Sequence, residues 1–167
     1  MKILFTGGGT GGHVFPIIAI VREIRRLYPK KLEFYYLGPK DDLATAYLSQ
    51  EDFIIKTIVS GKIRRYFDWK NIIDIVFKIP FGVVQSFFLL LATKPDLVFS
   101  KGGSGSVAVT YSARFLRIPV FLHESDIVPG LSNQTTAKWA KKIFISFLKT
   151  EYFDPVKTTL IGNPIRK

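Results

Sequence analysis

The chain has 167 residues, 47% of them hydrophobic, which is enough for one domain with a substantial core. It contains no cysteine, and this excludes disulfides, a thiol nucleophile and a thiolate metal site. Lys and Arg number 24 against 13 Asp and Glu, a formal net charge of +11 that favours anionic partners such as nucleic acid, anionic lipid or a phosphorylated substrate. We find no nucleic-acid-binding motif and expect no nucleic-acid partner. The apolar start, Ile3–Phe5, is too short for a signal peptide, so we expect a cytoplasmic location.

Short apolar segments alternate with helical ones along the chain. The predicted strands are residues 2–6, 32–37, 54–59, 97–100, 120–122, 143–147 and 159–161. The predicted helices are residues 15–27, 42–50, 70–93, 107–116 and 132–140, the last capped by Ser132 or Asn133. Strands separated by helices form a parallel sheet with helices on both faces, and right-handed crossovers place the strand-to-helix loops at one edge. We therefore predict a single Rossmann-like α/β domain.

The first of these loops is very rich in glycine. Residues 7–12 read Gly-Gly-Gly-Thr-Gly-Gly, and a helix begins close behind them with Pro16 in its first turn. Backbone N–H groups without side chains can approach a phosphate closely, and the helix end adds partial positive charge. A tight turn would explain one or two glycines but not five. The loop is therefore a predicted phosphate or diphosphate site.

The kind of phosphate site is narrowed by the surrounding residues. A GxGxxG pattern spans residues 7–12, but the dinucleotide fingerprint also needs an acid at the end of the second strand, and that strand ends in Gly38-Pro39. A P-loop would need Lys and Ser or Thr where His13 and Val14 stand. A dinucleotide-binding oxidoreductase is therefore the weaker alternative. The loop instead closes on His13, at the mouth of the helix.

The segment 7–16, Gly-Gly-Gly-Thr-Gly-Gly-His-Val-Phe-Pro, resembles the amino-terminal loop of the MurG family. That family transfers N-acetylglucosamine from UDP-GlcNAc to undecaprenyl-pyrophosphoryl-MurNAc-pentapeptide, converting lipid I to lipid II in peptidoglycan synthesis for cell wall, cell shape and division. The resemblance implies an inverting glycosyltransferase of the GT-B architecture, with two facing Rossmann-like domains. Residues 1–167 would be its amino-terminal, acceptor- and membrane-binding domain. The carboxy-terminal, donor-binding domain would be absent from this chain.

A second glycine loop, residues 100–106, follows the fourth predicted strand and reads Ser-Lys-Gly-Gly-Ser-Gly-Ser. Its serines can add hydroxyl donors, and Lys101 adds charge. Two such loops at one sheet edge favour a diphosphate ligand. The MurG family has a similar loop, usually with an aromatic residue where Ser104 stands here. The predicted acceptor-diphosphate residues are Gly8, Gly9, Gly102, Gly103, Ser104 and Ser106.

The third loop begins His-Glu-Ser-Asp at His123 and continues through Pro-Gly to Asn133. The MurG pattern is His-Glu-Gln-Asn, then Pro-Gly and Asn, so Ser125 and Asp126 depart from it. Asp126 brings a carboxylate toward a diphosphate, which is unfavourable unless the carboxylate is protonated or turned away. His123 and Glu124 have two open interpretations, as a pair that braces the loop or as functional groups.

Sugar transfer needs a base for the acceptor hydroxyl and positive charge on the departing UDP. His13 is the first candidate for the base because imidazole titrates near neutrality, with Glu124 and Asp126 as alternatives. His13 could instead bind phosphate. The resemblance assigns donor contacts to Thr10, Gly11, Gly12, Asp126 and Arg166. There is no Asp-x-Asp pair, so we expect no metal and no cofactor.

Residues 61–70 interleave basic and large apolar side chains. We predict a membrane patch made of Lys62, Ile63, Arg64, Arg65, Tyr66, Phe67, Trp69 and Lys70. The 15 uncharged residues 79–93 are too few to span a bilayer, and we expect residues 81–93 to be a core helix. The protein would lie on the cytoplasmic face of the bacterial plasma membrane. Its expected partners are UDP-GlcNAc, lipid I, an anionic membrane and the missing carboxy-terminal domain.

The same residues fit one further alternative. The chain could be a non-catalytic acceptor and membrane subunit of a split glycosyltransferase. The length of the complete reading frame would separate this possibility from a two-domain enzyme.

Overall fold

The computed structural model describes residues 1–8, 11–28, 31–61, 74–148 and 151–164. Within these ranges a seven-stranded sheet has the order β3-β2-β1-β4-β5-β6-β7, and every pairing is parallel. The strands are β1 Lys2–Thr6, β2 Glu33–Gly38, β3 Ile54–Thr57, β4 Leu97–Ser100, β5 Val120–Glu124, β6 Lys142–Ile145 and β7 Thr158–Leu160. The predicted strands are confirmed, with ends that differ by at most two residues.

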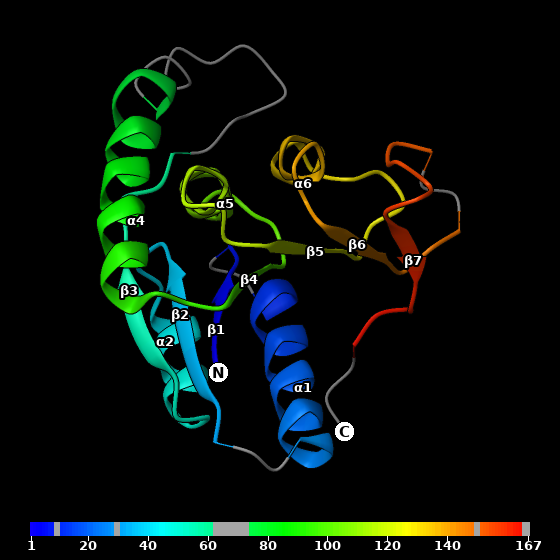
Figure 1. Cartoon of the computed structure of the whole chain (residues 1–167), viewed down its shortest axis with the longest axis horizontal. Helices are drawn as coiled ribbons and strands as arrows, with labels where there is room; N and C mark the ends of the chain where they lie inside the picture. Colours follow the sequence, from blue (N-terminus) through cyan, green and yellow to red (C-terminus); the bar gives the residue numbers. More distant parts are fainter. Residues whose placement is uncertain (9–10, 29–30, 62–73, 149–150, 165–167) are drawn as a thin grey trace.

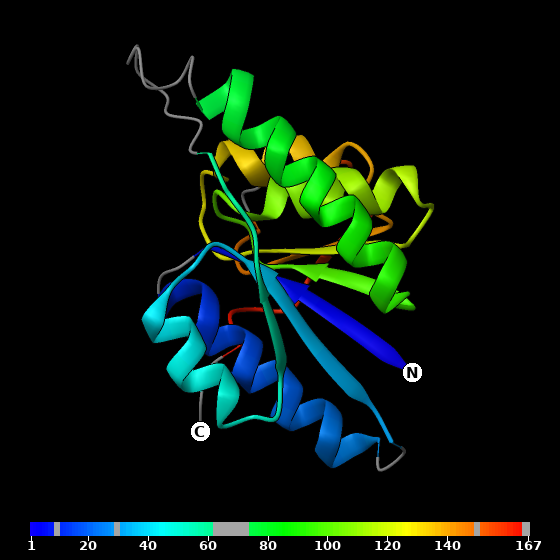
Figure 2. The ribbon, with the colours of Figure 1, turned by 90° about the vertical axis from the view of Figure 1, so that its left-hand side faces the viewer.

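Helices cover both faces of the sheet (Figures 1 and 2). They are α1 Gly11–Leu27, α2 Asp42–Ser49, α4 Ile79–Thr93, α5 Ser106–Phe115 and α6 Leu131–Ala137, and a π-helical turn, η1 Asp74–Lys78, leads directly into α4. α1 and α2 lie on one face, and α4, α5 and α6 lie on the other (Figure 2). The predicted Rossmann-like α/β class is confirmed.

Alternate residues of each central strand enter different cores. Ile3 and Phe5 of β1 join the core beneath α1 and α2, whereas Leu4 joins the core beneath α4 and α5. Both faces of a parallel sheet covered by helices are buried, which is why the strands read as continuous apolar runs.

The carboxyl ends of the central strands meet at one edge of the sheet. The register pairs Thr6 of β1 with Ser100 of β4, and Ser100 with Leu122 of β5. The backbone N–H of Lys101 then donates to the carbonyl of Thr6 over 2.9 Å. The loops that follow these three strands therefore lie beside one another, as the sequence predicts.

The helix α6 begins differently from the prediction. Its N-cap is Gly130, with extended backbone and no side-chain cap. The predicted cap, Ser132 or Asn133, is wrong because both side chains are used elsewhere, Ser132 against the second loop and Asn133 against the end of β5. The hydroxyl of Ser132 accepts from the N–H of Gly103 over 3.2 Å, and the amide of Asn133 donates to Glu124 over 2.8 Å.

The prediction that residues 81–93 form a core helix is wrong. In α4 only Gly82, Ser86 and Leu90 are buried. Its buried face is small because α5 lies against it: the hydroxyl of Ser112 donates to the carbonyl of Val83 over 2.9 Å, and a Cβ on Gly82 would approach the carbonyl oxygen of Val59 closely. The side chains of Phe81, Val84, Phe88 and Leu91 consequently point outward.

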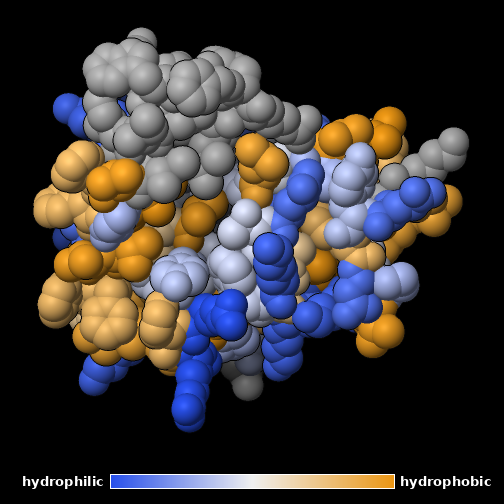
Figure 3. Space-filling view, turned by 90° about the horizontal axis from the view of Figure 1, so that it is seen from above, coloured by the Kyte–Doolittle hydropathy of each residue, from blue (hydrophilic) through white to orange (hydrophobic). Residues whose placement is uncertain are grey.

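Those outward side chains form an apolar surface on α4, which we call the α4 stripe. It consists of Phe77 in η1 and Phe81, Val84, Phe88 and Leu91 in α4, all exposed. Figure 3 shows hydrophobic residues gathered on the left of the molecule, the side on which α4 lies in Figure 1. The successive spacings of four, three, four and three residues place the stripe on one helical face.

Among the described residues, one helix, Val76–Thr93, is long and apolar enough to cross a membrane by length and composition alone. Its mean hydropathy is 1.7, and 17% of it is buried. This helix has 18 residues, more than the uncharged run 79–93, because it continues past Lys78 toward the amino terminus. The ammonium of Lys78 lies 2.7 Å from the carboxylate of Asp74, so that charge is paired.

Candidate functional site

The first and second glycine loops are in direct contact at the carboxyl edge of the sheet. A Cβ added to Gly103 would lie 2.5 Å from both Cα and N of Gly8, and Gly103 has a φ of +92°. A Cβ on Gly102, whose φ is +91°, would lie 2.4 Å from Oδ1 of Asn133. Only glycine fits either position. Packing thus explains the glycine pair of the second loop, and it makes the two loops one structural unit.

His13 lies in the first turn of α1, beside both loops. A Cβ on Gly8 would approach the His13 imidazole to 3.1 Å, and a Cβ on Gly103 would approach its Nε2 to 3.3 Å. Burial lowers the pKa of His13, the charge of Lys101 lowers it further, and Asp126 acts in the opposite direction. The imidazole is therefore neutral at pH 7, and a neutral imidazole can accept a proton.

Lys101 is almost completely buried between the second and third loops, with 2% of its surface exposed. Its ammonium donates to the hydroxyl of Ser125 over 2.8 Å. Burial lowers the pKa of Lys101, and the charges of Glu124 and Asp126 oppose that change. The charge of this lysine is evident from the sequence, whereas its burial was not predicted. Its position directly after an apolar strand is the signal that could have indicated burial.

The carboxylate of Glu124 is engaged within its own loop. It accepts the backbone N–H of Asp126 over 2.9 Å, the N–H of Gly130 over 3.3 Å and the side-chain amide of Asn133 over 2.8 Å. Only 3% of Glu124 is exposed. This geometry supports the interpretation of Glu124 as a loop brace.

His123 is fully buried at the end of β5. Its Nε2–H donates to the carbonyl of Gly162 over 3.1 Å, because a carbonyl can only accept. Burial lowers the pKa of His123 to about 4, so the ring is neutral at pH 7. His123 thereby joins β5 to the segment that follows β7.

The remaining predicted site residues divide into three groups. The Ser106 hydroxyl donates to the carbonyl of Gly103 over 2.8 Å, so it is used inside its own loop. Ser104, Gly11, Gly12 and Asp126 lie at the carboxyl edge of the sheet and have some exposed surface. The other predicted residues lie outside the described residues. They are Gly9, Thr10, Arg166 and the whole membrane patch, made of Lys62, Ile63, Arg64, Arg65, Tyr66, Phe67, Trp69 and Lys70.

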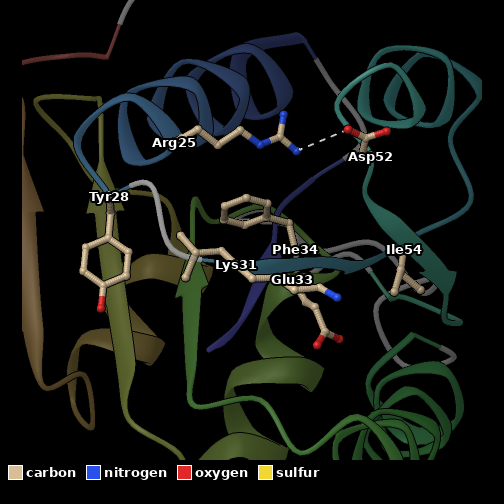
Figure 4. Close-up of a pocket in the computed structure, with 8 residues that line it drawn as sticks. Arg25, Tyr28, Lys31, Glu33, Phe34, Asp52 and Ile54 are labelled. Atoms are coloured by element: carbon tan, nitrogen blue, oxygen red, sulfur yellow. Dashed lines mark ion pairs between the residues drawn. The ribbon is translucent and has the colours of Figure 1, made fainter.

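A separate hollow of about 470 Å³ lies at the opposite edge of the sheet, where β2 and β3 begin (Figure 4). Here the Arg25 guanidinium lies 5.1 Å from the centre of the Phe34 ring and 3.8 Å from the carboxylate of Asp52. Tyr28, Lys31 and Glu33 also line the hollow. None of the predicted site residues in the described ranges lines this hollow.

The pattern of the glycosyltransferase family 28 N-terminal domain matches residues 3–145. Among curated proteins, this chain is 42% identical to a relative from Borrelia hermsii and 43% identical to one from Shouchella clausii. Both relatives are named UDP-N-acetylglucosamine–N-acetylmuramyl-(pentapeptide) pyrophosphoryl-undecaprenol N-acetylglucosamine transferase. Each match covers 99% of this chain and 46% of the relative. The chain therefore spans about half the length of the curated relatives it matches.

Two solved structures share the fold. Acinetobacter baumannii MurG superposes with a TM-score of 0.79 at 24% identity, covering 99% of this chain and 46% of that one. UDP-GlcNAc 2-epimerase from Neisseria meningitidis, bound to UDP-GlcNAc, superposes with a TM-score of 0.70 at 15% identity, covering 98% and 47%. Because the family pattern extends from β1 to the end of β6, the chain belongs to the glycosyltransferase family 28 N-terminal domain family.

Proposed function

We propose that this chain is the acceptor-binding half of an inverting glycosyltransferase that moves N-acetylglucosamine from UDP-GlcNAc to lipid I, forming lipid II. The observation that carries the proposal is the contact of the two glycine loops beside His13, at the edge of the sheet where α/β domains bind ligands. The relatives from Borrelia hermsii and Shouchella clausii, which are named for this transfer, support the same reaction.

In this proposal the acceptor diphosphate binds at the glycine loops and the amino terminus of α1, where backbone N–H groups and the helix dipole favour an anion. The neutral imidazole of His13 takes the proton from the acceptor sugar hydroxyl. The hydroxyl oxygen then bonds to the anomeric carbon of N-acetylglucosamine while the bond from that carbon to UDP breaks. UDP leaves with the bonding electron pair, and inversion follows from this single displacement. Glu124 holds the third loop in shape.

The α4 stripe is the proposed membrane surface within the described residues. A helix with one apolar face lies in the plane of a bilayer with that face among the acyl chains, and basic residues meet the anionic headgroups. Lys94, at the carboxyl end of α4, is exposed and suits that contact. The protein would thus be peripheral, on the cytoplasmic face of the bacterial plasma membrane, where lipid I is embedded.

The test is retention of the 167-residue chain on anionic vesicles with and without lipid I. We expect tighter retention when lipid I is present, and an intermediate gain with undecaprenyl pyrophosphate, which has the diphosphate but no sugar. Equal retention on all three vesicles would refute acceptor binding. We also expect no sugar transfer from UDP-GlcNAc by this chain alone, because catalysis needs both substrates held together. Robust turnover by residues 1–167 would contradict its assignment as half of the enzyme.

A further inference from the structure

Lys101 is held in place by both its backbone and its side chain. Its N–H donates to the carbonyl of Thr6 over 2.9 Å, which fixes the start of the second loop against the end of β1. Its ammonium donates to the hydroxyl of Ser125 over 2.8 Å, in the third loop. With 2% of the residue exposed, the charge is held between the loops and cannot turn out to solvent.

Two carboxylates act on that ammonium, and they differ in what else they bind. Glu124 is buried and already accepts three hydrogen bonds from its own loop. Asp126 is exposed at the same edge of the sheet, and its charge acts on both Lys101 and His13. Asp126 is therefore the carboxylate that an anion approaching this edge would meet.

An exposed carboxylate opposes the binding of a diphosphate unless a positive charge lies close by. A buried ammonium suits that task because salt and water screen it much less than an exposed one. The backbone N–H groups of the glycine loops carry only partial charges, so they do not replace a full positive charge.

We propose that Lys101 is a positioning residue whose buried ammonium offsets the charge of Asp126 and so allows a diphosphate to bind at the glycine loops. The inference rests on the proposed function for the identity of the ligand. The charge pairing itself can be measured without any ligand. Among the residues that the structure describes, Lys101 on the second loop and Asp126 on the third loop carry charges that act on His13.

The first experiment is an NMR titration of His13 in the 167-residue chain. Lys101→Gln removes the positive charge and keeps a donor for Ser125, so the pKa of His13 should rise. Asp126→Asn should lower it, and the double variant should return it toward the parent value. An unchanged His13 pKa in Lys101→Gln would overturn the pairing. If Lys101→Gln does not fold, the titration of the Lys101 ammonium in Asp126→Asn decides instead: loss of the exposed carboxylate should lower the pKa of Lys101, and an unchanged value would overturn the pairing.

The second experiment measures the affinity for inorganic pyrophosphate by calorimetry. Lys101→Gln should weaken binding about tenfold, Asp126→Asn should strengthen it, and the double variant should lie within about threefold of the parent. Lys138→Met, at the far end of α6, is the control for loss of one positive charge and should have little effect. If Lys101 only braced the loop, Asp126→Asn would not restore the double variant, and the proposal would be wrong. Failure of the parent chain to bind pyrophosphate would instead refute the diphosphate assignment, whatever the His13 titration shows.

Discussion

The side-chain amide of Asn133 donates to the buried carboxylate of Glu124 over 2.8 Å, and it joins the first turn of α6 to the end of β5. The same carboxylate accepts the backbone N–H groups of Asp126 and Gly130. Three donors around one acceptor hold the third loop in a single shape. That shape in turn places Ser125 beside Lys101.

Glu124→Gln should destabilise the chain. A carboxylate only accepts hydrogen bonds, whereas an amide must turn its NH₂ group toward at least one of the three donors. The expected loss is roughly 1–3 kcal/mol of unfolding free energy, measured by urea denaturation. Glu151→Gln, at an exposed position, is the matched control and should change little. A Glu124→Gln chain as stable as the parent would argue against the brace and return Glu124 to the candidates for the base.

Two alanine variants distinguish the loss of stability caused by steric overlap between the glycine loops from the loss caused by backbone strain. Gly103 and Gly162 both have positive φ, +92° and +79°, but a Cβ would meet Gly8 at the first position and nothing within 4 Å at the second. Gly162→Ala should cost about 1–2 kcal/mol from strain alone. Gly103→Ala should cost roughly 2–5 kcal/mol, because overpacking adds to the strain. Equal losses in urea denaturation would show that the loops do not pack as described.

The stability of the chain should fall in mild acid because of His123. Burial depresses its folded-state pKa to about 4, below the ordinary value of 6.5 in the unfolded chain. The unfolded state therefore binds more protons between these values, so stability is complete above pH 6.5 and declines as the pH falls toward 4. The loss attributable to His123 is roughly 3 kcal/mol.

His123→Gln is the comparison for this pH dependence, because its amide can donate to the carbonyl of Gly162 but does not titrate. Between pH 6.5 and pH 4 the parent should lose roughly 3 kcal/mol more unfolding free energy than the variant, so the stability of the variant relative to the parent should rise as the pH falls. Parallel pH dependences in the two proteins would refute the assignment to His123. The pKa of His13 is lowered by burial as well, but its contribution is common to both chains.

The α4 stripe should be required for binding to anionic vesicles. Replacing Phe81 and Phe88 by Ser removes two large apolar groups from the membrane face, and retention should fall by roughly tenfold or more. Phe115→Ser on α5 is the matched control, since Phe115 and Phe88 are 65% and 64% exposed. Thermal stability should change little in either variant. Undiminished retention of the double variant would exclude the stripe as the membrane surface.

In a two-domain protein that contains this chain and a donor-binding domain, His13→Ala should lower kcat by roughly 10²–10⁴-fold, as expected for the loss of a general base. A residue that only bound phosphate would mainly raise KM. Because burial lowers the His13 pKa, the rate should fall on the acid side below pH 6.5, where the imidazole takes up a proton. The His13→Ala variant should lack that acidic limb. An unchanged kcat with an unchanged limb would leave Asp126 as the next candidate.

Much of the fold could be predicted from the sequence because its signals are local. Each strand is a short apolar run, each helix follows a loop, and alternation of the two permits a parallel sheet with its loops at one edge. The glycine loops and His13 were found for the same reason, since residue type and spacing along the chain define them. Their adjacency followed from topology alone.

Only the tertiary structure decided how polar and apolar groups are used. The sequence predicts that Phe81 and Phe88 are core residues, but α4 is buried through Gly82, Ser86 and Leu90, so both phenylalanines point outward. Ser132 reads as a helix cap, but its hydroxyl accepts from Gly103 across the loops. The sequence predicts that Lys101 adds charge to the second loop, and the structure buries that charge against Ser125. The chain by itself determined which residues gather at the carboxyl edge of the sheet. The partners that each residue finds there depend on contacts between segments distant in sequence, and no local pattern encodes them.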